Sequence, residues 1–203
     1  MRDEAELIRA AIGGDRRAFE TMVVLKRERV VRTAYQVTGD LEDARDVAQQ
    51  VFIRLWKVLP KFDPERKFDT WLYRITVNAA IDHLRSRGPQ GVLQPLPDDP
   101  SRLEGAATAG DAERAIDLEE LQRVFSRLAA NLAPRQRAAF VLREIEGFET
   151  AEVARILNVR ESTVRNHLHQ ARRVLRAGIR RDYPSLVPRG HDAAGDDDGG
   201  DDS

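Results

Sequence analysis

The segment TAEVARILNVRESTVRNHLHQARRVLR, residues 150–176, decides how the second half of this chain folds. Its later part carries one apolar stripe at the helical period, formed by Val164, Leu168, Ala171 and Leu175. Asn158 separates this stripe from an earlier periodic run, and asparagine readily adopts the left-handed conformation of a tight turn. Ala154 is small where two helices would approach each other. The segment therefore predicts a helix-turn-helix.

The outer face of the second helix is rich in arginine, histidine and asparagine. Arginine and asparagine can contact guanine and adenine edges in the DNA major groove through two hydrogen bonds at once. The arginines that follow suit phosphate contacts: Arg173, Arg176, Arg180 and Arg181. The alternative is a helical hairpin whose basic face is only solvated, as most charged faces are. The turn residue, the small residue and the charge together favour DNA binding.

The charge of the chain is segregated along its length. The 203 residues carry a net charge of −1, which taken alone argues against a nucleic-acid partner. Seven acids against one arginine give residues 182–203 a charge of −6, and six against two give residues 89–117 a charge of −4. Residues 1–88 are at +3 and residues 118–181 at +6. The basic block thus coincides with the predicted DNA-binding face.

The composition also restricts chemistry and location. The chain has no cysteine, which excludes disulfides and thiolate metal sites and fits a reducing compartment. No apolar run approaches the roughly 20 residues that cross a membrane, and the N-terminus lacks an apolar signal core. No nucleotide-binding glycine motif is present, and His167 and His169 point to different sides of their helix. We expect a cytoplasmic protein with no membrane insertion, enzymatic activity, cofactor or metal.

Almost every periodic segment has the helical period, so we expect an all-α fold. Asp15 and Asp40 are the expected N-caps of helices that end at Thr38 and before Pro60. A further helix is expected from about Asp69 to Arg87.

In the second half, Pro134 is expected in the first turn of a helix ending at Gly147. Thr150 is expected to cap the next helix, and the basic helix to begin at Ser162 or Thr163. The chain thus divides into two small helical domains, residues 1–88 and 118–181. A flexible acidic linker, 89–117, joins them, and an acidic tail, 182–203, is expected to be disordered.

One face of the helix expected over 69–87 combines an aromatic ring, guanidinium groups and an amide. Its members recur at spacings of three and four: Trp71, Arg74, Asn78, Asp82 and Arg85. Such a face suits DNA whose bases are partly unstacked, because aromatics stack on bases and arginines hold the backbone. Trp71 alone has the alternative of simple burial between helices.

The preceding helix has an outer face that is acidic at its start and contains an isoleucine: Asp43, Asp46, Gln49, Gln50, Ile53 and Lys57. This pattern fits docking against a basic helical partner. Ordinary solvation is the alternative for this face.

Three segments in this order resemble a bacterial sigma factor of the extracytoplasmic-function (ECF) group. They are DLEDARDVAQQVFIRLW (40–56), FDTWLYRITVNAAIDHLRSR (68–87) and LAPRQRAAFVLREIEGFETAEVARILNVRESTVRNHLHQARRVLR (132–176). The resemblance covers nearly all of residues 1–181. It implies a transcription initiation factor whose first domain is sigma region two, a helical bundle, and whose second is region four.

The resemblance also assigns roles to residues of the first domain. The β′ clamp helices of core RNA polymerase would dock on Asp43, Asp46, Gln49, Gln50 and Ile53. The −10 promoter element would be melted and held, with capture of a flipped base, by Lys61, Phe62, Asp63, Phe68, Trp71, Arg74, Asn78, Asp82 and Arg85. Asn78 matches the family's base-reading position.

In the second domain, the resemblance implies binding to the polymerase β flap and to the −35 element. The −35 contacts would be Ser162, Thr163, Arg165, Asn166, His169, Gln170, Arg172 and Arg173. An anti-sigma factor is expected as a further partner. The chain departs from the family where Gln49-Gln50 replaces the common Gln-Glu, and where His167 and Gln170 stand at usual arginine positions.

A second function class remains open on the sequence alone. A stand-alone helix-turn-helix regulator would use residues 1–88 for dimerisation or sensing. Such a domain would have no use for the face of Trp71, Arg74 and Asn78, which therefore separates the two hypotheses.

Overall fold

The first half of the chain folds into packed helices in the computed structural model, which describes residues 3–86 and 112–184. These helices are α1 (Glu4–Ile12), α2 (Arg16–Thr38), α3 (Leu41–Val58), the short 3₁₀ helix η1 (Leu59–Lys61) and α4 (Phe68–Ser86). As predicted, the Asp15 and Asp40 carboxylates accept hydrogen bonds from the first-turn amides of α2 and α3. Gly39 ends α2 in the left-handed conformation, at φ 85°.

A buried lysine ties three of these helices together. The Lys26 ammonium of α2 lies 2.7 Å from a Glu4 carboxylate oxygen of α1 and 2.8 Å from Asp69 of α4. Burial opposes the charged form, but the hydrogen bonds with Asp69 and Glu4 outweigh it and raise the pKa of Lys26. Arg29 adds a second contact to Asp69 at 2.8 Å. The N-terminus of α4, and with it the preceding loop, is therefore fixed against α2.

The second half consists of α5 (Ala112–Ala129), α6 (Pro134–Phe140), a π-helical turn η3 (Val141–Ile145), α7 (Thr150–Leu157) and α8 (Glu161–Asp182). The helix expected from Pro134 to Gly147 therefore changes to a π turn after Phe140. Thr150 is the first residue of α7 and not its cap. The N-cap is Glu149, whose amide donates to the Glu152 carboxylate.

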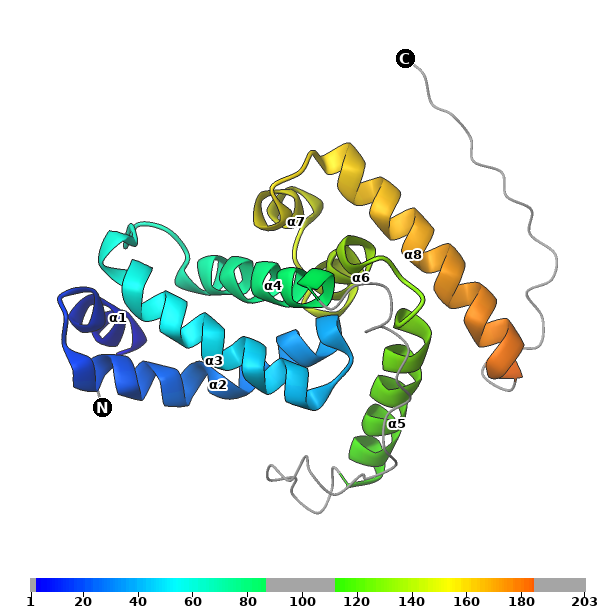
Figure 1. Ribbon diagram of the computed structural model, residues 1–203, viewed down its shortest axis with the longest axis horizontal. Helices are drawn as coiled ribbons and strands as arrows, with labels where there is room; N and C mark the ends of the chain where they lie inside the picture. Colours follow the sequence, from blue (N-terminus) through cyan, green and yellow to red (C-terminus); the bar gives the residue numbers. More distant parts are fainter. Residues whose placement is uncertain (1–2, 87–111, 185–203) are drawn as a thin grey trace.

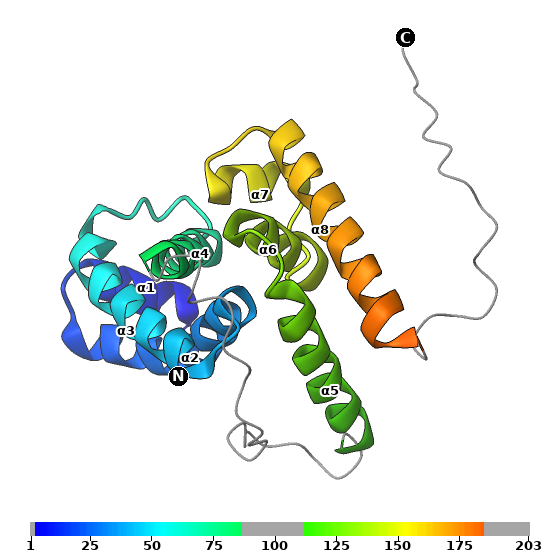
Figure 2. The same ribbon diagram turned by 45° about the vertical axis from the view of Figure 1, so that its right-hand side comes forward.

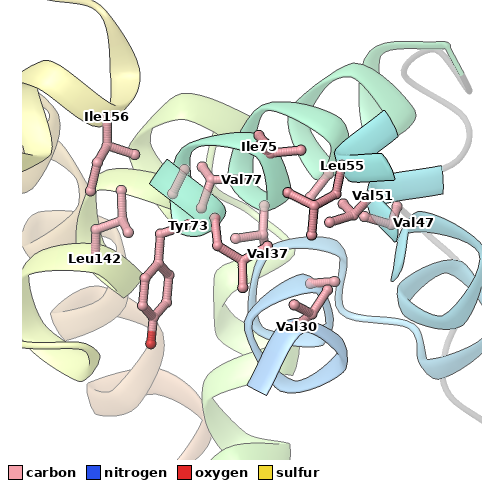
Figure 3. Packing of buried hydrophobic residues seen from close by; sticks show 14 of the residues in the cluster. Val30, Val37, Val47, Val51, Leu55, Tyr73, Ile75, Val77, Leu142 and Ile156 are labelled. Carbon is pink, nitrogen blue, oxygen red and sulfur yellow. The ribbon is translucent and has the colours of Figure 1, made fainter. Parts of the chain in front are cut away.

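The two halves pack directly on each other. Figures 1 and 2 show α6 and α7 beside α4, on the side away from α1. Tyr73 and Val77 of α4 share one core with Leu142 and Ile156 of the second half (Figure 3). A smaller second core joins α5 to α8. All secondary-structure elements among the described residues are helices, which agrees with the all-α prediction.

The predicted linker and tail fall mostly outside the described residues. Of the linker 89–117, residues 112–117 lie in α5, which therefore begins earlier than the predicted domain boundary. Of the tail 182–203, residue 182 ends α8 and residues 185–203 are not described.

Candidate nucleic-acid interface

The turn between α7 and α8 has the conformation that the sequence predicts. Asn158 has φ 53° and ψ 53°, the left-handed region, and ends α7. The Val159 amide donates to the Ala154 carbonyl at 3.0 Å, and the same carbonyl also accepts from the Asn158 amide. Ala154 and Val164 are buried between the two helices. The turn thereby presents the outer face of α8 to solvent (Figure 1).

Most of the predicted −35 residues lie on the outer face of α8. Ser162, Arg165, Asn166, His169, Arg172 and Arg173 are exposed, and Thr163 and Gln170 are half-buried. The Arg165 side chain is 68% exposed, with its guanidinium 4.0 Å from the Glu161 carboxylate one turn earlier. Arg165 and Asn166 are therefore free to approach a DNA groove.

Arg172 has a closer acidic partner than Arg165, and that partner lies on another element. Its guanidinium donates to the Glu144 carboxylate of η3 at 2.6 Å. Using Arg172 on DNA phosphate would require exchange of this partner, so the ion pair competes with DNA contact. The same pair holds the middle of α8 against η3.

Arg135, at the start of α6, extends the basic surface beyond α8. Burial and the charge of Arg135 lower the pKa of His167 on the adjacent face of α8. Sequence reasoning missed Arg135 because it lies 32 positions before His167 and on another helix. Only the packing of α6 on α8 shows that it joins this surface.

The predicted −10 residues divide into an exposed face and a buried aromatic cluster. Arg74, Asp82 and Arg85 of α4 are exposed, and Trp71 and Asn78 are half-buried on the same face. Lys61, the last residue of η1, and Asp63, in the loop that follows, are also exposed.

Phe62 and Phe68 are buried, and their rings pack against Trp71 with centroids 4.6 and 6.0 Å away. These two phenylalanines therefore do not lie on the exposed face that the −10 prediction describes. They support the loop and Trp71 from beneath.

The predicted polymerase-docking residues are likewise not all on one surface. Asp46, Gln49, Gln50 and Ile53 of α3 are exposed, with Ile53 at 51%. Asp43 is only 3% exposed, and its carboxylate lies 3.1 Å from the His83 ring of α4. The helical period placed Asp43 at the edge of this face, and packing of α4 covers it.

Trp56 extends the same face of α3. It is 41% exposed and packs one side against Phe19 at 4.7 Å between ring centroids. Together with Gln49 and Ile53 it forms a stripe at spacings of four and three. A half-exposed tryptophan next to an exposed isoleucine is typical of a protein-binding surface.

Residues 3–86 and 112–184 contain neither a candidate metal cluster nor a membrane-spanning helix. No cluster of three or more histidine or acidic side chains there is arranged to hold a metal ion. No described helix is long and apolar enough to cross a membrane.

Both halves of the chain match known family domains. Residues 23–90 match Sigma-70 region 2, and residues 122–175 match Sigma-70, region 4. The chain is 31% identical over 179 residues to the ECF RNA polymerase sigma factor SigW of Bacillus subtilis, with 82% of this chain and 91% of that protein covered. It is 31% identical to the ECF RNA polymerase sigma-E factor of Escherichia coli strain K12, with 80% and 86% covered.

Solved structures show the same fold. The structure of CnrH in complex with the cytosolic domain of CnrY is similar with a TM-score of 0.61 and 25% identity, and covers 89% of this chain and 99% of that chain. The sigma factor RpoE of Bartonella quintana, in complex with the anti-sigma factor NepR, has a TM-score of 0.56 and 20% identity, with 81% and 98% covered.

Sigma-70 regions 2 and 4 in one chain define a bacterial transcription initiation factor. The match of region 2 decides against a stand-alone regulator with an unrelated sensor domain. The chain belongs to the ECF RNA polymerase sigma factors. Sigma factors bind core RNA polymerase, direct it to promoters and are initiation factors without enzymatic activity.

Proposed function

We propose that the two halves of this ECF sigma factor divide promoter recognition as follows. Residues 118–181 bind the −35 element in duplex form through the outer face of α8. Residues 1–88 bind polymerase and hold the melted −10 element. The proposal is supported chiefly by the exposed surface of α8, where Arg165 and Asn166 are the side chains best suited to base edges.

For the −10 element, the exposed face of α4 is the reading surface. Asn78 is half-buried between Arg74 and Asp82, a position in which an amide can contact a base while the arginine contacts phosphate. Phe62 and Phe68 act indirectly, by supporting Trp71 and the segment that carries Lys61 and Asp63.

For polymerase, the docking surface is the exposed stripe of α3. We place Asp46, Gln49, Gln50, Ile53 and Trp56 against the β′ clamp helices, and region four against the β flap. Asp43 contributes by fixing α3 to α4 through His83. The protein acts in the cytoplasm, where its polymerase is. We also propose that an anti-sigma factor regulates it, because the similar Bartonella quintana RpoE forms a complex with the anti-sigma factor NepR.

The experiment is in vitro transcription with sigma-free core polymerase and the Arg165→Ala and Asn78→Ala variants. Arg165→Ala removes a base contact and lowers discrimination at one −35 position by about 1–3 kcal/mol. Asn78→Ala reduces the permanganate reactivity of −10 thymines without weakening polymerase binding. Arg16→Ala, an exposed arginine on α2 that pairs with Glu20 one turn later, is the control. An unchanged −35 preference, or loss of polymerase binding by Asn78→Ala, contradicts the assignment.

A further inference from the structure

The π-helical turn η3 forms a rigid base beside the helix-turn-helix. Its first two residues, Val141 and Leu142, are fully buried. The Glu146 amide donates to the Val141 carbonyl at 2.9 Å, and the Phe148 amide donates to the Leu142 carbonyl at 3.0 Å. The backbone of the turn is therefore closed by its own hydrogen bonds. Side chains that leave η3 start from a fixed position.

Two consecutive side chains of η3 hold the two helices of the helix-turn-helix. The Arg143 guanidinium donates to the Phe148 carbonyl at 3.3 Å and lies 3.8 Å from the carboxylate of Glu149, the N-cap of α7. The Glu144 carboxylate accepts a hydrogen bond from the Arg172 guanidinium of α8 at 2.6 Å. The turn η3 is thus tied both to the start of α7 and to the middle of α8.

The contact of Arg172 with η3 acts on the side of α8 that carries Arg165. The two arginines are seven positions apart, which is about two helical turns, so they lie on the same side of the helix. Arg165 itself lies 4.0 Å from Glu161, a residue of α8, and that pair does not connect the helix to another element. The contact of Arg172 with η3 therefore restrains the rotation of α8 and the tilt of its base-reading side.

We infer that Arg172 is a positioning residue for −35 recognition and that Glu144 is its anchor. The pair holds α8 at the rotation in which Arg165 and Asn166 reach base edges, and Arg172 does not itself contact phosphate. The inference rests on the proposed function, because it assumes that α8 reads the −35 element. The side chains of Arg172 and Glu144 are 50% and 35% exposed, so solvent screens the pair and its effect on recognition is about two- to fivefold.

The direction of the Glu144→Gln effect separates positioning from phosphate contact. If Arg172 bound phosphate, loss of Glu144 would free it from a competing anion and strengthen DNA binding. If Arg172 positions α8, the same change loosens the base-reading side and lowers discrimination for the upstream element. Removal of an acid also raises the affinity for any DNA, so the quantity to measure is the ratio of the affinities for two duplexes.

The first test is a promoter-binding assay with holoenzyme assembled from the full chain and core polymerase. The two probes are a promoter obtained from mapped transcript starts and the same promoter with its upstream element scrambled. Glu144→Gln should reduce the ratio of the two affinities by about two- to fivefold. Glu20→Gln, which breaks the exposed pair with Arg16 on α2, is the matched control and should leave the ratio unchanged.

A double variant tests whether the two side chains act as one pair. Glu144→Gln combined with Arg172→Gln keeps the net charge of the parent. It should reduce the ratio no more than either single change, because each change alone breaks the same contact. An unchanged or larger ratio in Glu144→Gln, or losses that add in the double variant, would overturn the inference. Thermal melts check that each variant remains folded.

The second test is the salt dependence of promoter binding. Each lost phosphate contact lowers the slope of log affinity against log salt concentration by about 0.9. Arg172→Gln should leave this slope unchanged, whereas Arg173→Gln, the exposed neighbour on the outer face, should lower it. A lower slope in Arg172→Gln would reveal a phosphate contact and overturn the inference. A parent holoenzyme that does not prefer the intact upstream element would instead count against the proposed function.

Discussion

Replacing Arg137 with alanine tests how strongly region four stabilises region two. Arg137 is 4% exposed, and its guanidinium donates to the Gln36 carbonyl and lies 5.9 Å from the Phe125 ring centre. Burial lowers the pKa of Arg137 well below the usual arginine value, to about 10. At about 1.4 kcal/mol per pKa unit, the buried charge costs roughly 3 kcal/mol.

The hydrogen bonds of a charged donor stabilise the folded protein by about 1.5–3 kcal/mol. They therefore roughly offset the free-energy cost of burying the charge. The buried stem of Arg137, however, packs in the interface, and alanine would lose that packing, about 2 kcal/mol. We therefore expect Arg137→Ala to destabilise the protein by about 2 kcal/mol. Arg137→Met keeps the stem and should cost no more than about 1 kcal/mol.

Tryptophan fluorescence in a urea titration provides the assay. Both tryptophans, Trp56 and Trp71, lie in region two, so their signal reports region-two unfolding only. Arg137 lies in region four. With a denaturant slope of about 2 kcal/mol per molar, Arg137→Ala should lower the urea midpoint by about 1 M. An unchanged tryptophan transition would refute interdomain stabilisation, and an equal loss in Arg137→Met would refute the packing argument.

Three further outcomes are expected. Gly178→Ala should destabilise region four by about 1–3 kcal/mol in thermal melts, because its Cβ would lie 2.6 Å from Leu128 Cδ2, and Leu128→Ala in the same chain should remove that clash. Burial and Arg135 lower the pKa of His167, so below about pH 6.5 the unfolded chain binds more protons than the folded one, and stability falls as the pH drops through that range. His167→Asn should reduce the difference in stability between thermal melts at pH 7 and pH 5, by at most about 1.4 kcal/mol per pH unit. Asn158→Gly should keep duplex binding, whereas Asn158→Val should cost at least about 1–2 kcal/mol of stability in urea titrations, since a β-branched residue resists φ 53°.

The helix-turn-helix could be predicted from sequence because its determinants are local. The apolar stripe of α8, the left-handed Asn158 and the small Ala154 lie within one short segment, and their preferences agree. The Asp15 and Asp40 caps were predictable for the same reason, since each side chain bonds to amides two or three positions away.

The interface between the halves could not be predicted, because its contacts join distant positions. Arg137 meets the Gln36 carbonyl across 101 residues, and Tyr73 meets Glu146 across 73. In sequence, Arg137 is one more arginine in a basic helix, and no periodicity distinguishes a buried arginine from a solvated one. The burial of Asp43 has the same origin, since it depends on His83 of another helix.

The division of promoter recognition is tested most directly by mapping transcript starts from fragmented genomic DNA of the source organism, with core polymerase and either the parent or Arg165→Ala. The account predicts starts that share a two-part motif, with the downstream part unchanged and one upstream position relaxed in the variant. Starts with no shared upstream element, or an upstream element identical in both proteins, would contradict the assignment of Arg165 and α8 to the −35 element.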